Sequence, residues 1–196
     1  MKARGMNEPP GGRRHAAQPD RELLWSDPFE RLALGQRFSG AERTVGEADV
    51  NVFAALTGDS HPQHCDPEWA RTSPFGARIA HGMLILSFAV GLIPLDPERV
   101  LALRRVHDAT FKRPVRLGDT ISVAGELTAL RPVDERTGLV EFTWEIRNQD
   151  RALVCRAKVA LLWSAGKRAE PSGASGFWHD DMLGEPPAGE FTPLPL

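Results

Sequence analysis

The chain has 196 residues, a length that suits one domain with extensions better than two domains. Charged residues make up 26% and hydrophobic residues 41% of it, as in folded soluble proteins, and the net charge is −2. No global basic field is present to collect nucleic acid or an anionic membrane surface, so we expect neither as a partner. Two cysteines, Cys65 and Cys155, allow at most one disulfide, and the basic N-terminus lacks the apolar stretch of a secretory signal. Both features favour a cytoplasmic location.

Both ends of the chain are rich in Pro and Gly and poor in apolar anchors. We predict a flexible extension over residues 1–24, a folded body over residues 25–165, and a Pro- and Gly-rich tail over residues 166–196. The tail contains one apolar spot at residues 177–179, which favours a tether packed on the body.

The first half of the body predicts a short strand over residues 38–44 and a short helix over residues 46–56. A long loop dense in turn formers follows, with a helical turn expected over residues 67–71. Residues 79–93 are almost all apolar, and a helix that is apolar on every face must be buried on most sides. This stretch is too short to span a bilayer.

The second half of the body predicts four strands. They cover residues 100–111, 120–130, 140–147 and 153–163, and the last two alternate clearly between apolar and polar side chains. Such alternation is typical of an antiparallel sheet with one solvated face. One buried helix beside a run of long strands indicates an α+β fold in which the sheet wraps around the helix.

Two polar side chains in the long loop could carry acid/base chemistry. Asp59 follows a glycine, and His64 lies five positions later across a Pro-containing turn. A carboxylate and an imidazole held close together can bind and activate one water. The alternative is structural, because Asp and His in such loops also form Asx turns and helix caps.

The start of the buried helix is the second candidate element. His81 and Gly82 fall there, where the first backbone N–H groups lack partners within the helix and favour negative charge. A glycine lets a substrate carbonyl approach closely, so Gly82 could form an oxyanion site. Plain helix packing is the alternative for Gly82, and a structural hydrogen bond is the alternative for His81.

The order of these residues resembles the MaoC-like family of (R)-specific enoyl-thioester hydratases and dehydratases. The chain reads F-A-A-L-T-G-D-S-H-P-Q-H-C-D over residues 53–66 and P-F-G-A-R-I-A-H-G-M-L over residues 74–84. These segments are similar to the family's G-D-x-N-P-x-H-x-D and F-x-x-x-I-A-H-G. A third segment, residues 111–119, is similar to F-x-x-P-V-x-x-G-D, so the likeness covers about residues 35–163.

This resemblance implies a hotdog fold, an antiparallel sheet wrapped around a long central helix, in at least a homodimer. It implies that Asp59 and His64 are the catalytic pair and that the Gly82 N–H binds the thioester oxygen. Ser87 matches a helix position near the active site in some members; the alternative for Ser87 is a bond to its own helix. His61 stands where the family has Asn, so we expect an imidazole in place of an amide beside the pair.

The implied reaction is hydration of an enoyl thioester, or dehydration of a 3-hydroxyacyl thioester, on coenzyme A or a carrier protein. The enzyme would be a hydro-lyase that needs no metal or redox cofactor. A hotdog thioesterase and a non-catalytic thioester-binding subunit are the rival hypotheses.

Two further sets of residues have functional and structural interpretations. The residues His61, His64, Cys65 and Asp66 suggest a metal site, but the wider ligand pattern of zinc sites is missing, and Asp66 also suits the cap of a helical turn. Four cations could meet the phosphates of coenzyme A or of a carrier-protein arm, although a solvated sheet edge explains them as well: Arg104, Arg105, Lys112 and Arg113.

Overall fold

The computed structural model describes residues 22–166, and the sequence predictions for residues 1–21 and 167–196 lie outside the described part. A 3₁₀ turn (Phe29–Arg31) precedes the strand β1 (Arg37–Thr44). The helices are α1 (Glu47–Thr57), α2 (Pro62–Cys65), α3 (Pro67–Thr72) and α4 (Gly82–Gly91). The remaining strands are β2 (Val100–Phe111), β3 (Thr120–Pro132), β4 (Thr137–Asn148) and β5 (Leu153–Ser164).

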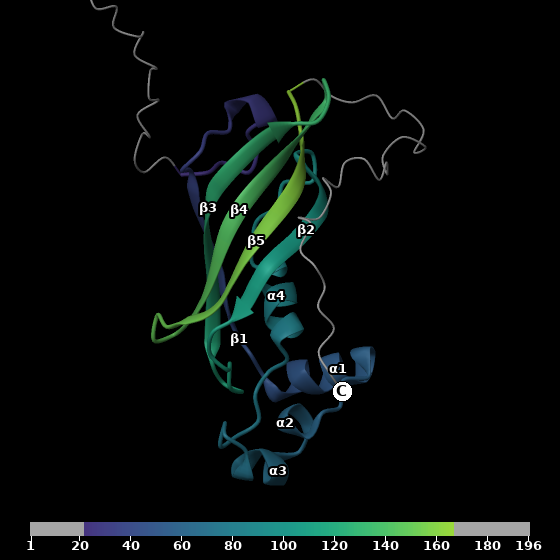
Figure 1. The fold of residues 1–196 in the computed structure, drawn as a ribbon, viewed down its shortest axis with the longest axis vertical. Helices are drawn as coiled ribbons and strands as arrows, with labels where there is room; N and C mark the ends of the chain where they lie inside the picture. The colour runs from purple at the N-terminus through teal and green to yellow at the C-terminus, as the bar shows by residue number, and fades with distance from the viewer. Residues whose placement is uncertain (1–21, 167–196) are drawn as a thin grey trace, which may run out of the picture.

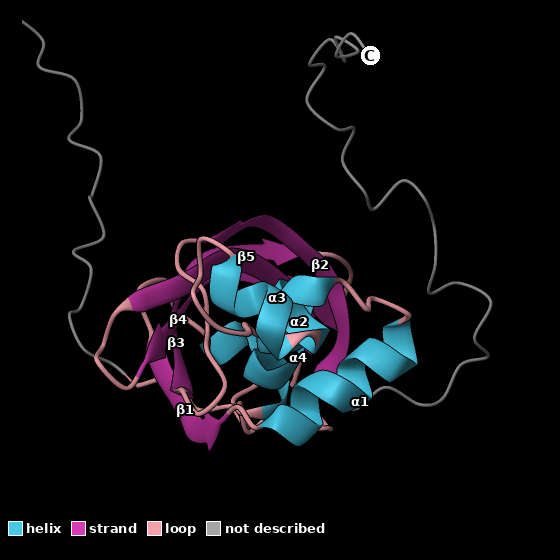
Figure 2. Ribbon diagram, turned by 90° about the horizontal axis from the view of Figure 1, so that it is seen from below, coloured by secondary structure: helices cyan, strands magenta, loops and turns pink. Residues whose placement is uncertain are grey.

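The five strands form one antiparallel sheet in the order β1-β3-β4-β5-β2. The sheet curves around α4, and α1, α2 and α3 gather at one end of the molecule (Figures 1 and 2). This arrangement confirms the predicted α+β fold with a sheet wrapped around a buried helix. It also leaves β1 and β2 as the two edge strands.

The core lies between the concave face of the sheet and α4. The inward side chains of β4 alternate as expected, and all four are at most 1% exposed: Val140, Phe142, Trp144 and Ile146. From the helix, Leu84, Ile85 and Ala89 face them. Each fully buried Val, Leu, Ile or Phe side chain contributes roughly 1.5–3 kcal/mol, so this contact is the main source of stability.

The packed body begins before residue 25, which corrects one predicted boundary. Leu23 was assigned to the N-terminal extension, but it is 3% exposed and belongs to the core. Its N–H donates to the Arg37 carbonyl (2.7 Å), which adds it to the end of β1. Trp25 then stacks on Trp163 with ring centroids 5.6 Å apart. Leu23 and Trp25 follow a long polar stretch, and two apolar residues at the end of such a stretch are a weak sequence signal for packing.

The central helix is shorter than the apolar run that predicted it. Helix α4 begins at Gly82, whereas the apolar pattern starts at residue 79. The Ala80 N–H instead donates to the Val115 carbonyl (2.8 Å), and Ile79 bridges Arg116 in antiparallel fashion. The chain is therefore extended up to the helix start. Within the described residues, no helix is both long and apolar enough to cross a membrane.

Candidate active site

The backbone turn after α1 presents Asp59. The helix ends at Gly58, whose φ of 79° lies in the left-handed region that glycine adopts without a Cβ penalty. The next N–H, that of Asp59, donates to Thr57 Oγ1 (3.3 Å), which fixes the turn. The Asp59 side chain is 53% exposed, so its carboxylate remains open to water.

His64 projects from the short helix α2 and is buried (5% exposed). Its Nδ1 lies 2.7 Å from the Ile79 carbonyl oxygen. A carbonyl can only accept, so Nδ1 carries the proton and the ring lone pair of the neutral imidazole is at Nε2. Burial lowers the pKa of His64, which favours that neutral ring at neutral pH. The side chain is thus prepared to accept a proton at Nε2.

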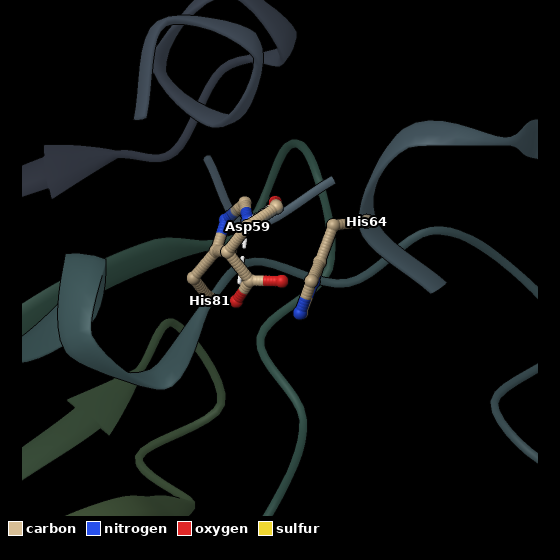
Figure 3. A group of neighbouring side chains, drawn as sticks. All are labelled: Asp59, His64 and His81. Atoms are coloured by element: carbon tan, nitrogen blue, oxygen red, sulfur yellow. Dashed lines mark hydrogen bonds and ion pairs between the residues drawn. The ribbon is translucent and has the colours of Figure 1, made fainter. Parts of the chain in front are cut away.

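His81 links the two predicted catalytic residues. Its ring stacks on the ring of His64 with centroids 3.8 Å apart and an interplanar angle of 25°. Its Nε2 donates to the Asp59 carbonyl (2.9 Å) and lies 3.9 Å from the Asp59 carboxylate. Figure 3 shows that carboxylate beside the two imidazoles. The structural interpretation of His81 therefore agrees with its contacts, and the bonds that it makes are to the active-site loop.

Gly82 is the first residue of α4, and within residues 22–166 no protein group accepts a hydrogen bond from its N–H. A cavity of about 450 Å³ adjoins it, within the size range of small-molecule sites. His64 lines the same cavity as Gly82, and apolar residues such as Ile79, Ile85 and Phe111 line much of the rest. A neutral imidazole and a free helix N-terminus therefore face one largely apolar space.

Of the six predicted site residues, only His64 and Gly82 line this cavity; Asp59 and His81 lie beside His64 without lining it, and His61 and Ser87 do not line it either. The His61 ring accepts a hydrogen bond from the Gln63 N–H (3.2 Å) and so caps α2, with its centroid 6.3 Å from that of His64. The exposed Ser87 donates to the Met83 carbonyl of its own helix (2.9 Å). Neither His61 nor Ser87 lines the cavity. For Ser87, the bond to its own helix is the contact that the structure contains.

Two residues that the sequence did not single out bond His64 directly. The Arg78 guanidinium donates to the His64 carbonyl (2.6 Å), and the Gln63 amide nitrogen lies 2.9 Å from His64 Nε2. Arg78 also binds Glu47 (2.6 Å) and Asn51 (2.7 Å), which ties the loop to α1. A lone cation just before an apolar helix was the only sequence signal for Arg78.

The structure gives little support for a metal site. A carboxylate oxygen of Asp59 and nitrogens of His64 and His81 lie within 4.8 Å of one another. The two rings are stacked, however, so their nitrogens do not converge on one point, and each ring already bonds a carbonyl oxygen. Of the ligands suggested by sequence, Asp66 caps α3 instead by accepting from Glu68 N (2.9 Å) and Trp69 N (3.0 Å).

The four cations proposed for phosphate binding are divided by the fold. Lys112 and Arg113 line the cavity beside Phe111, whereas Arg104 and Arg105 lie on β2 away from it. Only the first two are therefore placed to meet a ligand in this cavity.

Comparison with known proteins identifies the family. The model of the MaoC like domain matches residues 31–148. The chain is 36% identical over 132 residues to the (R)-specific enoyl-CoA hydratase of Aeromonas caviae, covering 67% of this chain and 96% of that protein.

Solved structures agree. The MaoC-like dehydratase from Rhodospirillum rubrum superposes with a TM-score of 0.65 at 26% identity, covering 72% of this chain and 99% of that one. A Mycobacterium tuberculosis protein described as a double hotdog fold, Rv0216, superposes with a TM-score of 0.64 at 22% identity, covering 85% of this chain and 53% of that one, which supports the hotdog fold alone. Relatives bear the names hydratase and dehydratase, which denote hydro-lyases. The chain therefore belongs to the MaoC-like family of hotdog-fold hydratases and dehydratases.

Proposed function

We propose that this protein hydrates enoyl thioesters, or dehydrates 3-hydroxyacyl thioesters in the reverse direction, with Asp59 and His64 as the acid/base pair. The observation that carries the proposal is the cavity shared by His64 and the free N–H of Gly82, with the Asp59 carboxylate beside His64. An activated water and an oxyanion donor are the two elements that addition to a conjugated thioester needs.

In the proposed reaction, the Asp59 carboxylate and the neutral His64 hold one water between them. The water oxygen forms a bond to C3 of the enoyl thioester while the pair takes up one of the water's protons. Electron density moves from the double bond toward the thioester oxygen, where the Gly82 N–H stabilises it. The pair then returns a proton to C2, so that atoms and charge balance without a metal or redox cofactor.

The substrate would enter with its acyl chain along the apolar wall and its pantetheine arm toward solvent. Lys112 and Arg113 at the cavity supply positive charge for the phosphates of coenzyme A or of a carrier protein.

A cytoplasmic location stays a prediction, supported by Cys65 and Cys155, which are both free thiols.

We further propose a homodimer in which the β2 edges of two copies meet. Strand β2 is an edge of the sheet and carries large apolar side chains that are 41–49% exposed: Leu101, Leu103, Val106 and Phe111. A row of exposed apolar residues on an edge strand is a typical pairing surface. Analytical ultracentrifugation should give a dimer for the wild type and a monomer for Leu103→Asp; a monomeric wild type would contradict the proposal.

The function is tested by turnover on a panel of enoyl-CoA substrates of increasing chain length. Asp59→Asn and His64→Ala should each lower kcat by about 100- to 10,000-fold, the usual range for loss of a general acid or base. Thermal melting should show that both variants remain folded. Undiminished hydration by both variants would refute the assignment of the pair, and release of free thiol without hydration would indicate a thioesterase instead.

A further inference from the structure

Gln63, the residue directly before His64, contacts His64 Nε2, the ring nitrogen that the proposed reaction uses. The Gln63 side-chain nitrogen lies 2.9 Å from His64 Nε2, and Gln63 lines the same cavity as His64 and Gly82. Its backbone is held on both sides, because its carbonyl accepts from the Ile79 N–H (3.1 Å) and its N–H donates to His61 (3.2 Å). The side chain therefore starts from a fixed point next to the imidazole.

The direction of the Gln63–His64 bond follows from the other side of the ring. Because the Ile79 carbonyl can only accept, His64 Nδ1 must be the donor, and Nε2 of the neutral ring can then only accept. The amide of Gln63 must therefore donate to Nε2. A second donor, such as water, cannot use the same lone pair at the same time.

We propose that Gln63 is a positioning residue that caps the base: its amide occupies the His64 Nε2 lone pair in the resting protein and must leave before His64 can take a proton from water. This inference rests on the proposed function, in which His64 belongs to the acid/base pair. The ring itself does not need Gln63 for its orientation, since the Ile79 carbonyl and the stacked His81 already hold it. The amide acts on the lone pair alone.

The cap has a consequence for the titration of His64 that can be measured without turnover. A donor to Nε2 stabilises the neutral ring and so opposes protonation. The Gln63→Leu substitution removes the amide and its bond to Nε2. The Gln63→Glu substitution supplies a carboxylate that accepts from a protonated Nε2 instead. The other titratable groups around the ring, Asp59, His61 and His81, stay the same in each variant.

The experiment measures the pKa and tautomer of His64 by ¹⁵N NMR of histidine side chains in the full chain. We expect the Nδ1–H tautomer in the wild type and a pKa that rises in the order wild type, Gln63→Leu, Gln63→Glu. Thr72→Glu, which adds the same charge at an exposed position of α3, should leave the His64 pKa unchanged. An Nε2–H tautomer in the wild type, or equal pKa values in the wild type and Gln63→Leu, would overturn the cap.

Kinetics supply the second readout. The acid limb of the kcat/KM profile should move in the same order as the NMR pKa. Above that limb, Gln63→Leu should raise kcat/KM by about two- to tenfold, the equilibrium factor for one neutral hydrogen bond that no longer has to break. A fall in this plateau would mean that the amide assists the reaction, which also overturns the cap. If neither the wild type nor any variant turns over an enoyl-CoA, the proposed function fails. The NMR result still shows whether the Gln63 amide donates to His64 Nε2.

Discussion

Replacing Arg78 tests whether the loop that carries Asp59 and His64 is held by side-chain bonds or by its backbone alone. The guanidinium makes three bonds of 2.6–2.7 Å, to the His64 carbonyl, to Glu47 and to Asn51. Arg78→Met keeps much of the side-chain volume and removes all three bonds. The Arg78 side chain is only 10% exposed, so water replaces these bonds poorly.

The expected loss of stability can be worked out bond by bond. A hydrogen bond from a charged donor, such as that to the His64 carbonyl, contributes about 1.5–3 kcal/mol, and the bond to the Asn51 amide adds about 1 kcal/mol. The Glu47 carboxylate is 66% exposed, so its screened ion pair adds only about 0.5 kcal/mol. The free energy of unfolding should therefore fall by about 3–4.5 kcal/mol in Arg78→Met, but by only about 0.5 kcal/mol in the matched control Glu47→Gln.

The assay combines urea unfolding with steady-state turnover. Because His64 would lose the bond that fixes its backbone, kcat should fall about 10- to 100-fold in Arg78→Met, as for misplacements of about 1 Å. Arg78→Lys should recover only part of this loss, since one ammonium cannot replace a planar fork of donors. A loss of less than about 1 kcal/mol together with wild-type kcat would refute the argument, because it would mean that the backbone alone positions His64.

Two other predictions follow from the same site. Gly82→Ala would place a Cβ 2.8 Å from two atoms of the Phe111 ring, so the ring must move off the helix start; kcat/KM should fall while circular dichroism stays native, and unchanged kinetics would show that the cavity tolerates a methyl group there. The lowered pKa of His64 means that its contribution to stability is present above the unfolded value of about 6.5 and is lost as the pH falls through the folded pKa. Urea unfolding from pH 8 to pH 5 should therefore show a steeper loss for the wild type than for His64→Gln, and parallel curves would contradict the shift.

The strands were predictable because one face of each meets the core. Alternation predicted a strand over residues 140–147, and the observed β4 extends this by three residues at its start and one at its end. Strand β5 departs from simple alternation, because Ala160 and Leu162 are buried as well as their neighbours. On the core-facing side of the same strand, the segment before β1 packs against Trp163, whose Nε1 donates to the Asp27 carbonyl (2.8 Å). A pattern within one strand cannot reveal such a contact, which joins residues 136 positions apart.

The site was predictable only in part, for a similar reason. The closeness of Asp59 and His64 follows from a short turn, so local sequence indicated it. The contacts that orient the pair come from the segment leading into α4, through Arg78, Ile79 and His81. These contacts join positions 14 to 22 residues apart, and no local pattern encodes them. Family motifs mark the residues without stating what each one touches.

The segment that leads into α4, residues 73–82, has one part in which substitutions should be tolerated and one part in which they should not. Arg78, Ile79 and His81 each bond the loop that carries Asp59 and His64, so a substitution or insertion there would disturb that loop. The preceding turn, residues 73–77, is fixed mainly by its own bonds, such as Gly76 N–H to the Ser73 carbonyl (3.0 Å), yet it places Phe75 in the cavity wall. Mutations in this turn could reshape the wall for longer or branched chains of the proposed acyl substrate without touching the proposed acid/base pair. Substitutions in residues 73–77 could therefore change substrate preference during evolution while the proposed acid/base chemistry stays the same.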